Sequence, residues 1–272
     1  MIRTFGGVAL DRPRVMAIVN VTPDSFSDGG ERLDPARAVE DGLRFVAEGA
    51  DFVDVGGEST RPGSRPTPAE EELRRVLPVI AGLTRQGAVV SVDTRRASVA
   101  VAALDAGARI VNDVSALRDD PDLLPLVARR GCDVVLMHRR GLPENTFAGP
   151  PYANVVEDVR RFLLERAAAC EAAGVNRQRI ALDPGLGFGK GVAQELDLIA
   201  GTGRLADAGY PILVGCSRKS FIGKLTGVEK ASDRDPASAW LSAEAVRHGA
   251  SIVRVHNVVA MRQTLAVSAA MR

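Results

Sequence analysis

Polar and charged side chains follow each of eight short apolar runs in this sequence. They are Asn20, Glu58, Asp93, Asn112, Asp113, His138, Asp183, Ser217 to Lys219, Arg254 and His256. A single polar residue at the end of a run is usually a helix cap or a turn former. Because such residues recur at all eight runs, we expect them to lie together, as they do where the carboxyl ends of parallel strands meet.

The run SIVRVHN (251–257) suggests an anion site. In a strand Arg254 and His256 alternate with valines, so both would project from the same face. An Arg and a His side by side make a cationic wall that suits an anionic ligand. A structural ion pair with an inward-facing Asp is the alternative that this pattern leaves open.

Two carboxylates and one amide form a second candidate group. In a strand Asp93 shares a face with Ser91, and Asp183 shares a face with Ala181, so both acids would face the inside of a barrel. Together with Asn112 they can hydrogen-bond a heterocycle rich in ring N–H and amino groups, or they can act as an acid and base pair. The spacing alone does not separate these two roles.

The segment GCSRKSFIG (215–223) places Lys219 and Ser220 directly after the seventh run. In barrels this position frequently holds phosphate, which favours a phosphate or heterocycle contact. A Schiff-base lysine, as in a class I aldolase, is the competing interpretation. The glycine-rich DPGLGFGKG (183–191) matches neither a dinucleotide fingerprint nor a P-loop.

The runs themselves predict parallel strands covered by helices, because their apolar character is nearly continuous. We expect strands at 15–21, 52–57, 89–94, 109–115, 133–138, 180–185, 211–217 and 251–257. Helical patterns lie between them, at 34–49, 67–87, 95–106, 121–130, 154–173, 193–208, 236–248 and 258–270. This alternation predicts an α/β fold, a (β/α)8 TIM barrel, as one domain over residues 1–272. The longer connections, 22–34 and 58–67, are expected at the mouth of the site.

Composition excludes several classes of protein. The formal net charge of +1 argues against a nucleic-acid binder, and no apolar run approaches the roughly 20 residues that span a bilayer. Three widely spaced cysteines and an N-terminus without an apolar signal segment favour the cytoplasm. Without an HExxH or CxxC motif we expect no dedicated zinc or iron site, but Mg²⁺ bound by one protein oxygen and substrate phosphates is compatible with the sequence.

The motifs as a set resemble one known family, the dihydropteroate synthases of folate biosynthesis. The resemblance covers nearly the whole chain and rests on NVTPDSFSDGG (20–30), DVGGESTRPGS (54–64), SVDT (91–94), NDVS (112–115), LMH (136–138), DPGLGFGK (183–190), GCSRKSFIG (215–223) and VRVHNV (253–258). It implies a barrel enzyme, a transferase that condenses 6-hydroxymethyl-7,8-dihydropterin diphosphate with 4-aminobenzoate and releases diphosphate.

The resemblance also implies roles for particular residues. Pterin contacts would be Asp93, Asn112, Asp183 and Lys219, with Met137 and Phe188 packed on the ring. Diphosphate contacts would be Asn20 through Mg²⁺, Thr60, Arg61, Arg254 and His256, and 4-aminobenzoate would lie between the first two loops and Ser220. Asp93, Lys219, Arg254 and His256 would be the catalytic groups. The family resemblance further implies a homodimer formed through helices of the barrel wall.

Two other functions share parts of this pattern, and a few residues depart from it. A pterin-binding methyltransferase barrel shares the Asp, Asn and Asp contacts, and a non-catalytic pterin-binding paralogue would share the whole fold. Arg139-Arg140, Ala116 and Asn257 depart from the residues common in the family. None of them is an implied contact, so they bear on fine specificity.

Overall fold

The computed structural model describes residues 2–22, 34–59, 64, 66–141 and 152–271. Its main sheet contains eight parallel strands in the order β8-β7-β6-β5-β4-β3-β10-β9. The strands are β3 (Arg14–Asn20), β4 (Phe52–Gly56), β5 (Val90–Asp93), β6 (Ile110–Asp113), β7 (Asp133–Met137), β8 (Ile180–Asp183), β9 (Leu213–Val214) and β10 (Ile252–Val255). A parallel bridge between Leu182 and Ile212 joins the two edges, so the sheet closes into the predicted barrel.

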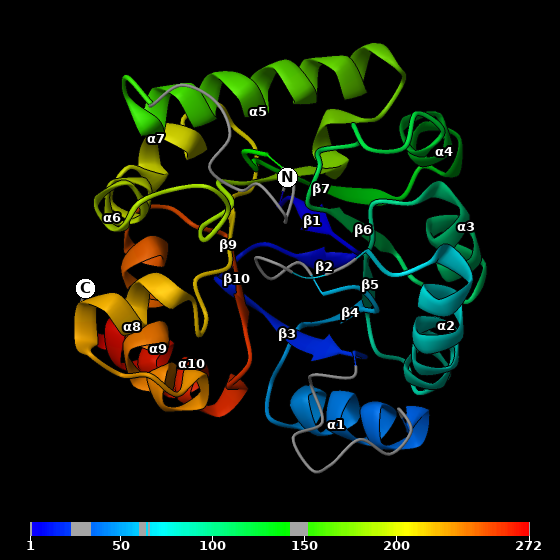
Figure 1. Cartoon of the computed structure of the whole chain (residues 1–272), viewed down its shortest axis with the longest axis horizontal. Helices are drawn as coiled ribbons and strands as arrows, with labels where there is room; N and C mark the ends of the chain where they lie inside the picture. The colour runs from blue at the N-terminus through cyan, green and yellow to red at the C-terminus, as the bar shows by residue number, and fades with distance from the viewer. Residues whose placement is uncertain (1, 23–33, 60–63, 65, 142–151, 272) are drawn as a thin grey trace.

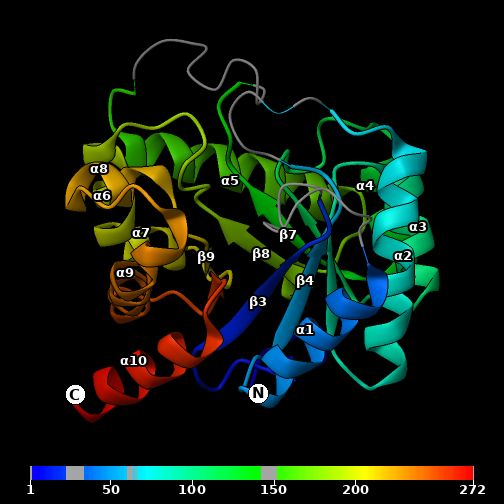
Figure 2. The same ribbon diagram turned by 60° about the horizontal axis from the view of Figure 1, so that its bottom comes forward.

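Helices surround these strands on every side (Figures 1 and 2). They are α1 (Pro35–Ala47), α2 (Ala69–Arg85), α3 (Ala97–Asp105), α4 (Leu123–Arg130), α5 (Val155–Ala172), α6 (Val192–Ala200), α7 (Thr202–Ala206), α8 (Ser220–Thr226), α9 (Asp235–Arg247) and α10 (Val258–Ala270). Short 3-10 turns cover Arg177–Arg179 and Ala231–Arg234. The fold predicted from the alternation of runs is confirmed.

Local chemistry explains where α1 begins. Asp34 caps α1, because its carboxylate accepts a hydrogen bond from the Ala36 amide at 2.9 Å, and Pro35 occupies the first helical position. The helix predicted over 193–208 is two helices, α6 and α7, separated at Gly201. The seven-residue helix α8, directly after Lys219, was not predicted.

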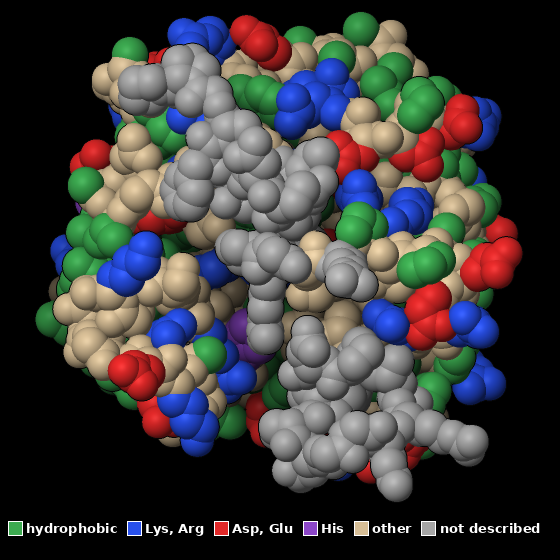
Figure 3. Space-filling view, viewed as in Figure 1, with side chains coloured by type: hydrophobic (Ala, Val, Ile, Leu, Met, Phe, Trp, Pro, Cys, Tyr) green, Lys and Arg blue, Asp and Glu red, His purple; other side chains and the backbone are tan. Residues whose placement is uncertain are grey.

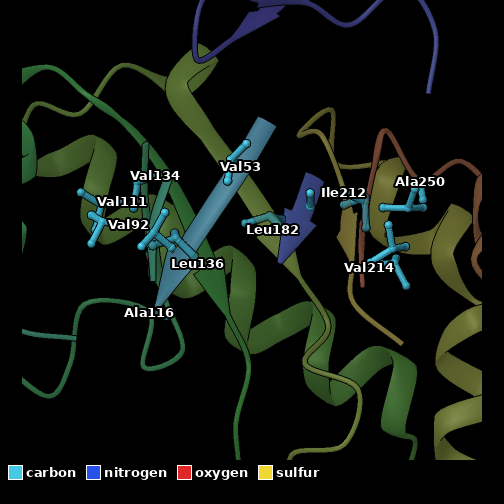
Figure 4. Packing of buried hydrophobic residues seen from close by; sticks show 14 of the residues in the cluster. Val53, Val92, Val111, Ala116, Val134, Leu136, Leu182, Ile212, Val214 and Ala250 are labelled. Carbon is cyan, nitrogen blue, oxygen red and sulfur yellow. The ribbon is translucent and has the colours of Figure 1, made fainter. Parts of the chain in front are cut away.

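The core has two layers. The larger layer fills the space between strands and helices and includes Val53, Val92, Val134, Leu136 and Leu182 (Figure 4). The smaller layer lies inside the barrel and consists of Phe5, Met16, Phe52, Ile110, Val135, Ala181, Leu213 and Ile252. All eight inner side chains are fully buried, so side chains fill the half of the barrel nearer the amino ends of the strands.

Phe5 enters this inner layer from a hairpin that the sequence analysis missed. The antiparallel strands β1 (Thr4–Phe5) and β2 (Val8–Ala9) are joined by Gly6 and Gly7, both at positive φ. The Phe5 ring meets Phe52 edge to face, with ring centroids 6.3 Å apart. The hairpin therefore covers the amino end of the barrel and leaves the carboxyl end for ligands.

Two further properties concern the chain as a whole. No helix in the described part of the chain combines the length and the hydropathy needed to cross a membrane. Cys132, Cys170 and Cys216 are all buried free thiols.

Candidate active site

The strand register brings the predicted polar residues to one end of the barrel. Asp93 of β5 lies beside Asn112 of β6, and Met137 of β7 lies beside Asp183 of β8. Their strand neighbours two residues earlier belong to the inner layer or face it, as alternation requires. Figure 3, viewed into this end, shows a histidine and several Lys or Arg side chains beside the central hollow.

Arg254 links two carboxylates across the barrel. Its Nε donates to Asp54 Oδ2 at 2.6 Å, and its Nη2 donates to Asp93 Oδ2 at 2.8 Å. The side chain is 18% exposed. The ion pair with an inward Asp, left open by the sequence, is thus present. In the described part of the chain, Nη1 makes no hydrogen bond.

Asp54 was not identified as a site residue, and it is central to the arrangement. It is fully buried, and its Oδ2 also accepts a hydrogen bond from Asn112 Nδ2 at 3.0 Å. Its Oδ1 has no partner among the described residues. The signal was an acid in the middle of the apolar run FVDVGG, on the same face as Phe52 and Gly56.

Burial changes the ionisation of both predicted acids. It raises the pKa of Asp93 to about 7, with Asp54 adding to the shift, although Arg254 beside it pulls the pKa down. Burial likewise raises the pKa of Asp183 to about 6, against the effect of the Gly185 amide, which donates to Asp183 Oδ1 at 2.7 Å. Both carboxyls therefore titrate near neutral pH, as groups poised for ligands often do.

Lys219 contacts the ring of Phe188, and Asp183 is close enough to influence its charge. The Lys219 Nζ is 4.4 Å from the centroid of the Phe188 ring. Burial lowers the pKa of Lys219, as Arg254 also does, whereas Asp183 raises it. Met137 is buried at the end of β7. An apolar ring face, a sulfur and an ammonium group thus border the two acids and Asn112.

His256 differs from its prediction in charge. Burial lowers its pKa to about 3, with Arg218 and Arg254 adding to the shift, so the imidazole is neutral near pH 7. Its Nδ1 lies 3.0 Å from Ser217 Oγ. The predicted cationic wall therefore contains one cation, Arg254. Asn20, His256 and Arg218 also line a cavity of about 420 Å³ beside the mouth.

The residue before Lys219 has a left-handed backbone that its neighbours maintain. Arg218 has φ +60°, and its guanidinium donates to both oxygens of Asp235 at 2.6 and 2.8 Å. Its amide donates to Ser238 Oγ at 2.9 Å. Asn257, one of the departures, donates to Asp235 as well, at 3.1 Å. An Asp at position 257 would place a second carboxylate there, so Asn suits this protein's contacts.

The other departures also have structural roles. Arg139 is buried and forms an ion pair with Asp119, and the Arg140 guanidinium lies 3.6 Å from the centre of the Tyr152 ring. Ala116 is buried with φ +54°, a conformation in which glycine is the unstrained residue.

Of the loop predicted over 58–67, the structure describes residues 58, 59, 64, 66 and 67. Glu58 accepts hydrogen bonds from Arg95, Arg96 and the Thr67 amide, the last at 2.9 Å, so one side chain holds both ends of the segment. Thr60 and Arg61, and most of 22–34, lie outside the described residues. Ser220 begins α8 and is exposed.

Fold and site together define a (β/α)8 barrel whose carboxyl end gathers carboxylates, an amide and basic side chains. The model of a family described as pterin binding enzyme matches residues 16–256. A dihydropteroate synthase of Mycobacterium leprae is 48% identical over 260 residues, 93% of this chain and 92% of that protein. That of Escherichia coli is 42% identical over 255 residues, 93% and 90% of the two chains.

Solved structures agree with these relatives. The Xanthomonas albilineans dihydropteroate synthase with 4-aminobenzoic acid is 49% identical, covers 97% of this chain and 94% of its own, and has a TM-score of 0.91. Its complex with 7,8-dihydropteroate is 47% identical, with coverages of 97% and 95% and a TM-score of 0.88. This chain belongs to the dihydropteroate synthase family.

Proposed function

We propose that this protein is a transferase that condenses 6-hydroxymethyl-7,8-dihydropterin diphosphate with 4-aminobenzoate to give 7,8-dihydropteroate and diphosphate. The observation that carries the proposal is the joined set of Asp54, Asp93, Asn112 and Arg254 at the carboxyl end of the barrel. The family, and the bound ligands named for the Xanthomonas structures, give the substrate class.

The pterin binds to the acids and the amide. Asp93 and Asp183 accept hydrogen bonds from ring N–H and amino groups, Asn112 pairs with a ring donor or acceptor, and Lys219 donates to a ring acceptor. Met137 and Phe188 pack against the ring. The raised pKa values of the two acids support this arrangement, because ligand N–H donors compensate for the burial of their charges.

The diphosphate binds on the other side of the mouth. Arg254 Nη1, which has no recorded partner in the described residues, donates to a phosphate oxygen, and neutral His256 donates from Nε2 while Nδ1 accepts from Ser217. Thr60 and Arg61 add further contacts. Ser220 and the loops 22–34 and 58–67 enclose the 4-aminobenzoate.

Asn20 would supply one protein ligand to Mg²⁺, and phosphate and water would supply the others. Asn20 ends β3 at the mouth beside His256, and among the described residues no cluster of three or more His, Cys, Asp or Glu could hold a metal alone. A neutral amide oxygen suits a hard cation that takes its remaining ligands from phosphate and water. When bound, Mg²⁺ would neutralise charge on the diphosphate.

The displacement proceeds by dissociation. The bond between the exocyclic CH₂ and the diphosphate oxygen breaks with its electron pair going to oxygen, and the positive charge spreads into the pterin. Asp93 stabilises that charge, and Arg254 and His256 stabilise the leaving anion. The amino group of 4-aminobenzoate then forms the C–N bond and loses one proton to solvent.

A diphosphate-release assay with purified protein tests this function. Release that depends on both the pterin diphosphate and 4-aminobenzoate, with dihydropteroate formed in equal amount, is the expected result. Pterin binding without diphosphate release would identify a non-catalytic paralogue. Transfer of a methyl group from a folate donor, with no diphosphate released, would identify the methyltransferase alternative.

We also propose a homodimer formed through α9 and α10. Trp240 on α9 is 60% exposed and Val267 on the neighbouring α10 is 62% exposed, and a second copy of the chain would cover these apolar side chains. Light scattering should give twice the chain mass for the wild type and the chain mass for Trp240→Arg. Arg74→Glu on α2 is the control, and it should remain dimeric.

The remaining proposals concern the chain as a whole. Residues 1–272 act as one barrel domain, which the core layers shared by all eight strands support. The cytoplasm is the site of action, which three buried thiols without a disulfide support.

A further inference from the structure

Lys190 is a buried lysine that the proposed chemistry does not use. It is 6% exposed, and its Nζ donates to three backbone carbonyls: Gly185 at 2.7 Å, Phe188 at 3.1 Å and His138 at 3.4 Å. Three acceptors use all three donors of the ammonium group. Lys190 lies in the glycine-rich segment 183–191, where Asp183 and Phe188 have proposed pterin contacts and Lys190 has no assigned role.

These carbonyls belong to the turn that follows β8 and to the residue that follows β7. The turn contains three glycines at positive φ, at 185, 187 and 189, so its backbone has little intrinsic preference for one shape. A Cβ on Gly185 would lie 1.8 Å from the His138 carbonyl oxygen, which shows how closely the two segments meet. A fixed partner is needed to hold such a turn.

Glu195 holds the same turn from the other side. It is 1% exposed on α6, and its Oε1 accepts a hydrogen bond from the Gly187 amide at 2.8 Å. Its Oε2 has no hydrogen-bond partner among the described residues, and the nearby Lys190 charge compensates part of that cost. Lys190 therefore binds the carbonyls of the turn, and Glu195 binds one of its amides.

The 185–189 turn contacts or contains three candidate pterin-binding residues, Asp183, Phe188 and Lys219. The Gly185 amide binds Asp183 at 2.7 Å, the Phe188 ring lies under the Lys219 ammonium, and a Cβ on Gly187 would come within 2.9 Å of Lys219 Cδ. A shift of the turn by one ångström would move all three groups at once.

We propose that Lys190 and Glu195 are positioning residues that fix the 185–189 turn, and with it Asp183, Phe188 and Lys219, in the geometry that binds the pterin ring. Neither residue touches the substrate. The inference rests on the proposed function, because it assigns the pterin to these three groups.

The first test compares Lys190→Met, which keeps the length without donors, with Lys190→Gln, which keeps an N–H donor. Calorimetry at 20 °C with a non-reactive pterin should show at least tenfold weaker binding for Lys190→Met and partial recovery for Lys190→Gln. The KM for 4-aminobenzoate should change less than threefold. Lys230→Met, at a lysine that is 75% exposed, is the matched control.

The second test covers the case in which Lys190→Met does not fold. Glu195→Leu removes the acceptor for the Gly187 amide together with a buried oxygen that lacks a partner, so folding should survive. Pterin binding should weaken three- to tenfold, while Glu195→Gln should bind nearly as the wild type does. Folded Lys190→Met or Glu195→Leu with wild-type pterin affinity would overturn the inference. A wild-type protein that binds no pterin would instead refute the proposed function.

Discussion

Replacing Arg254 by Lys separates charge from geometry at the centre of the site. The guanidinium reaches Asp54 and Asp93 through two different nitrogens, 2.6 and 2.8 Å away, and we propose that its third nitrogen contacts the diphosphate. A lysine ammonium is a point charge that cannot hold this fork. One charge-assisted hydrogen bond is worth about 1.5–3 kcal/mol, so turnover should fall about 10- to 150-fold.

The loss should appear mainly in kcat, since charge on the leaving oxygen is greatest in the transition state. It should also change the pH profile. Arg254 lowers the pKa of Asp93, which burial has raised to about 7, and weakening that contact raises this pKa further. If the ionised Asp93 is the active form, the acid limb of the kcat/KM profile, which reports the free enzyme, moves up by about one pH unit, equivalent to about 1.4 kcal/mol.

The assay is diphosphate release between pH 5.5 and 9, at saturating 4-aminobenzoate and Mg²⁺ and at both limiting and saturating pterin diphosphate. Arg247→Lys on the exposed face of α9 makes the same chemical change away from the site and should behave as the wild type. An Arg254→Lys enzyme with intact kcat and a raised KM would make Arg254 a binding residue only. An unmoved acid limb would refute the coupling to Asp93.

Three further predictions follow from the same geometry. Asp183→Asn should weaken the binding of a non-reactive pterin by about 2–3 kcal/mol in calorimetry. Because burial raises the pKa of Asp183 to about 6, wild-type affinity should fall as the pH drops below 6, and the variant should lack that dependence. Gly187→Ala places a Cβ 2.9 Å from Lys219 Cδ at φ +83°, so pterin affinity should drop about tenfold, and an unchanged affinity would contradict the packing. Ala116→Gly, at φ +54°, should change the free energy of unfolding by less than about 1 kcal/mol in urea titrations, whereas Ala103→Gly in α3 should lose about 1.5–2 kcal/mol; equal losses would mean that Ala116 is unstrained.

The pattern of the strands was sufficient to predict most of the fold, because a barrel repeats the same sequence pattern eight times. It also predicted that Asp93, Asp183 and Arg254 face inward, and in the barrel Asp93 pairs with Asn112, Asp183 with Met137, and Arg254 with the inner-layer residue Met16. The hairpin around Gly6 was not predicted, because two-residue strands are too short to show a periodic pattern. The division between α6 and α7 was not predicted either, because one glycine at position 201 separates two segments with a continuous helical pattern.

The sequence could not predict which side chains form hydrogen bonds with each other inside the site, and the reason is different. Arg254 and Asp54 are 200 residues apart, and only closure of the barrel brings them to 2.6 Å. Spacing could show that Arg254 faces inward, but not which carboxylate meets it. The neutrality of His256 likewise follows from burial and from the cations around it, and neither is visible in SIVRVHN.

The burial of every cysteine makes this protein convenient for site-directed spectroscopy. Burial raises the pKa of Cys132, Cys170 and Cys216 to about 11, whereas an exposed thiol titrates near 8.5. At neutral pH a thiol placed on the surface would carry roughly 300 times more thiolate than any native one. A fluorophore on Lys224→Cys, exposed on α8 beside Ser220, could then follow 4-aminobenzoate arriving in real time, with all three native cysteines left in place.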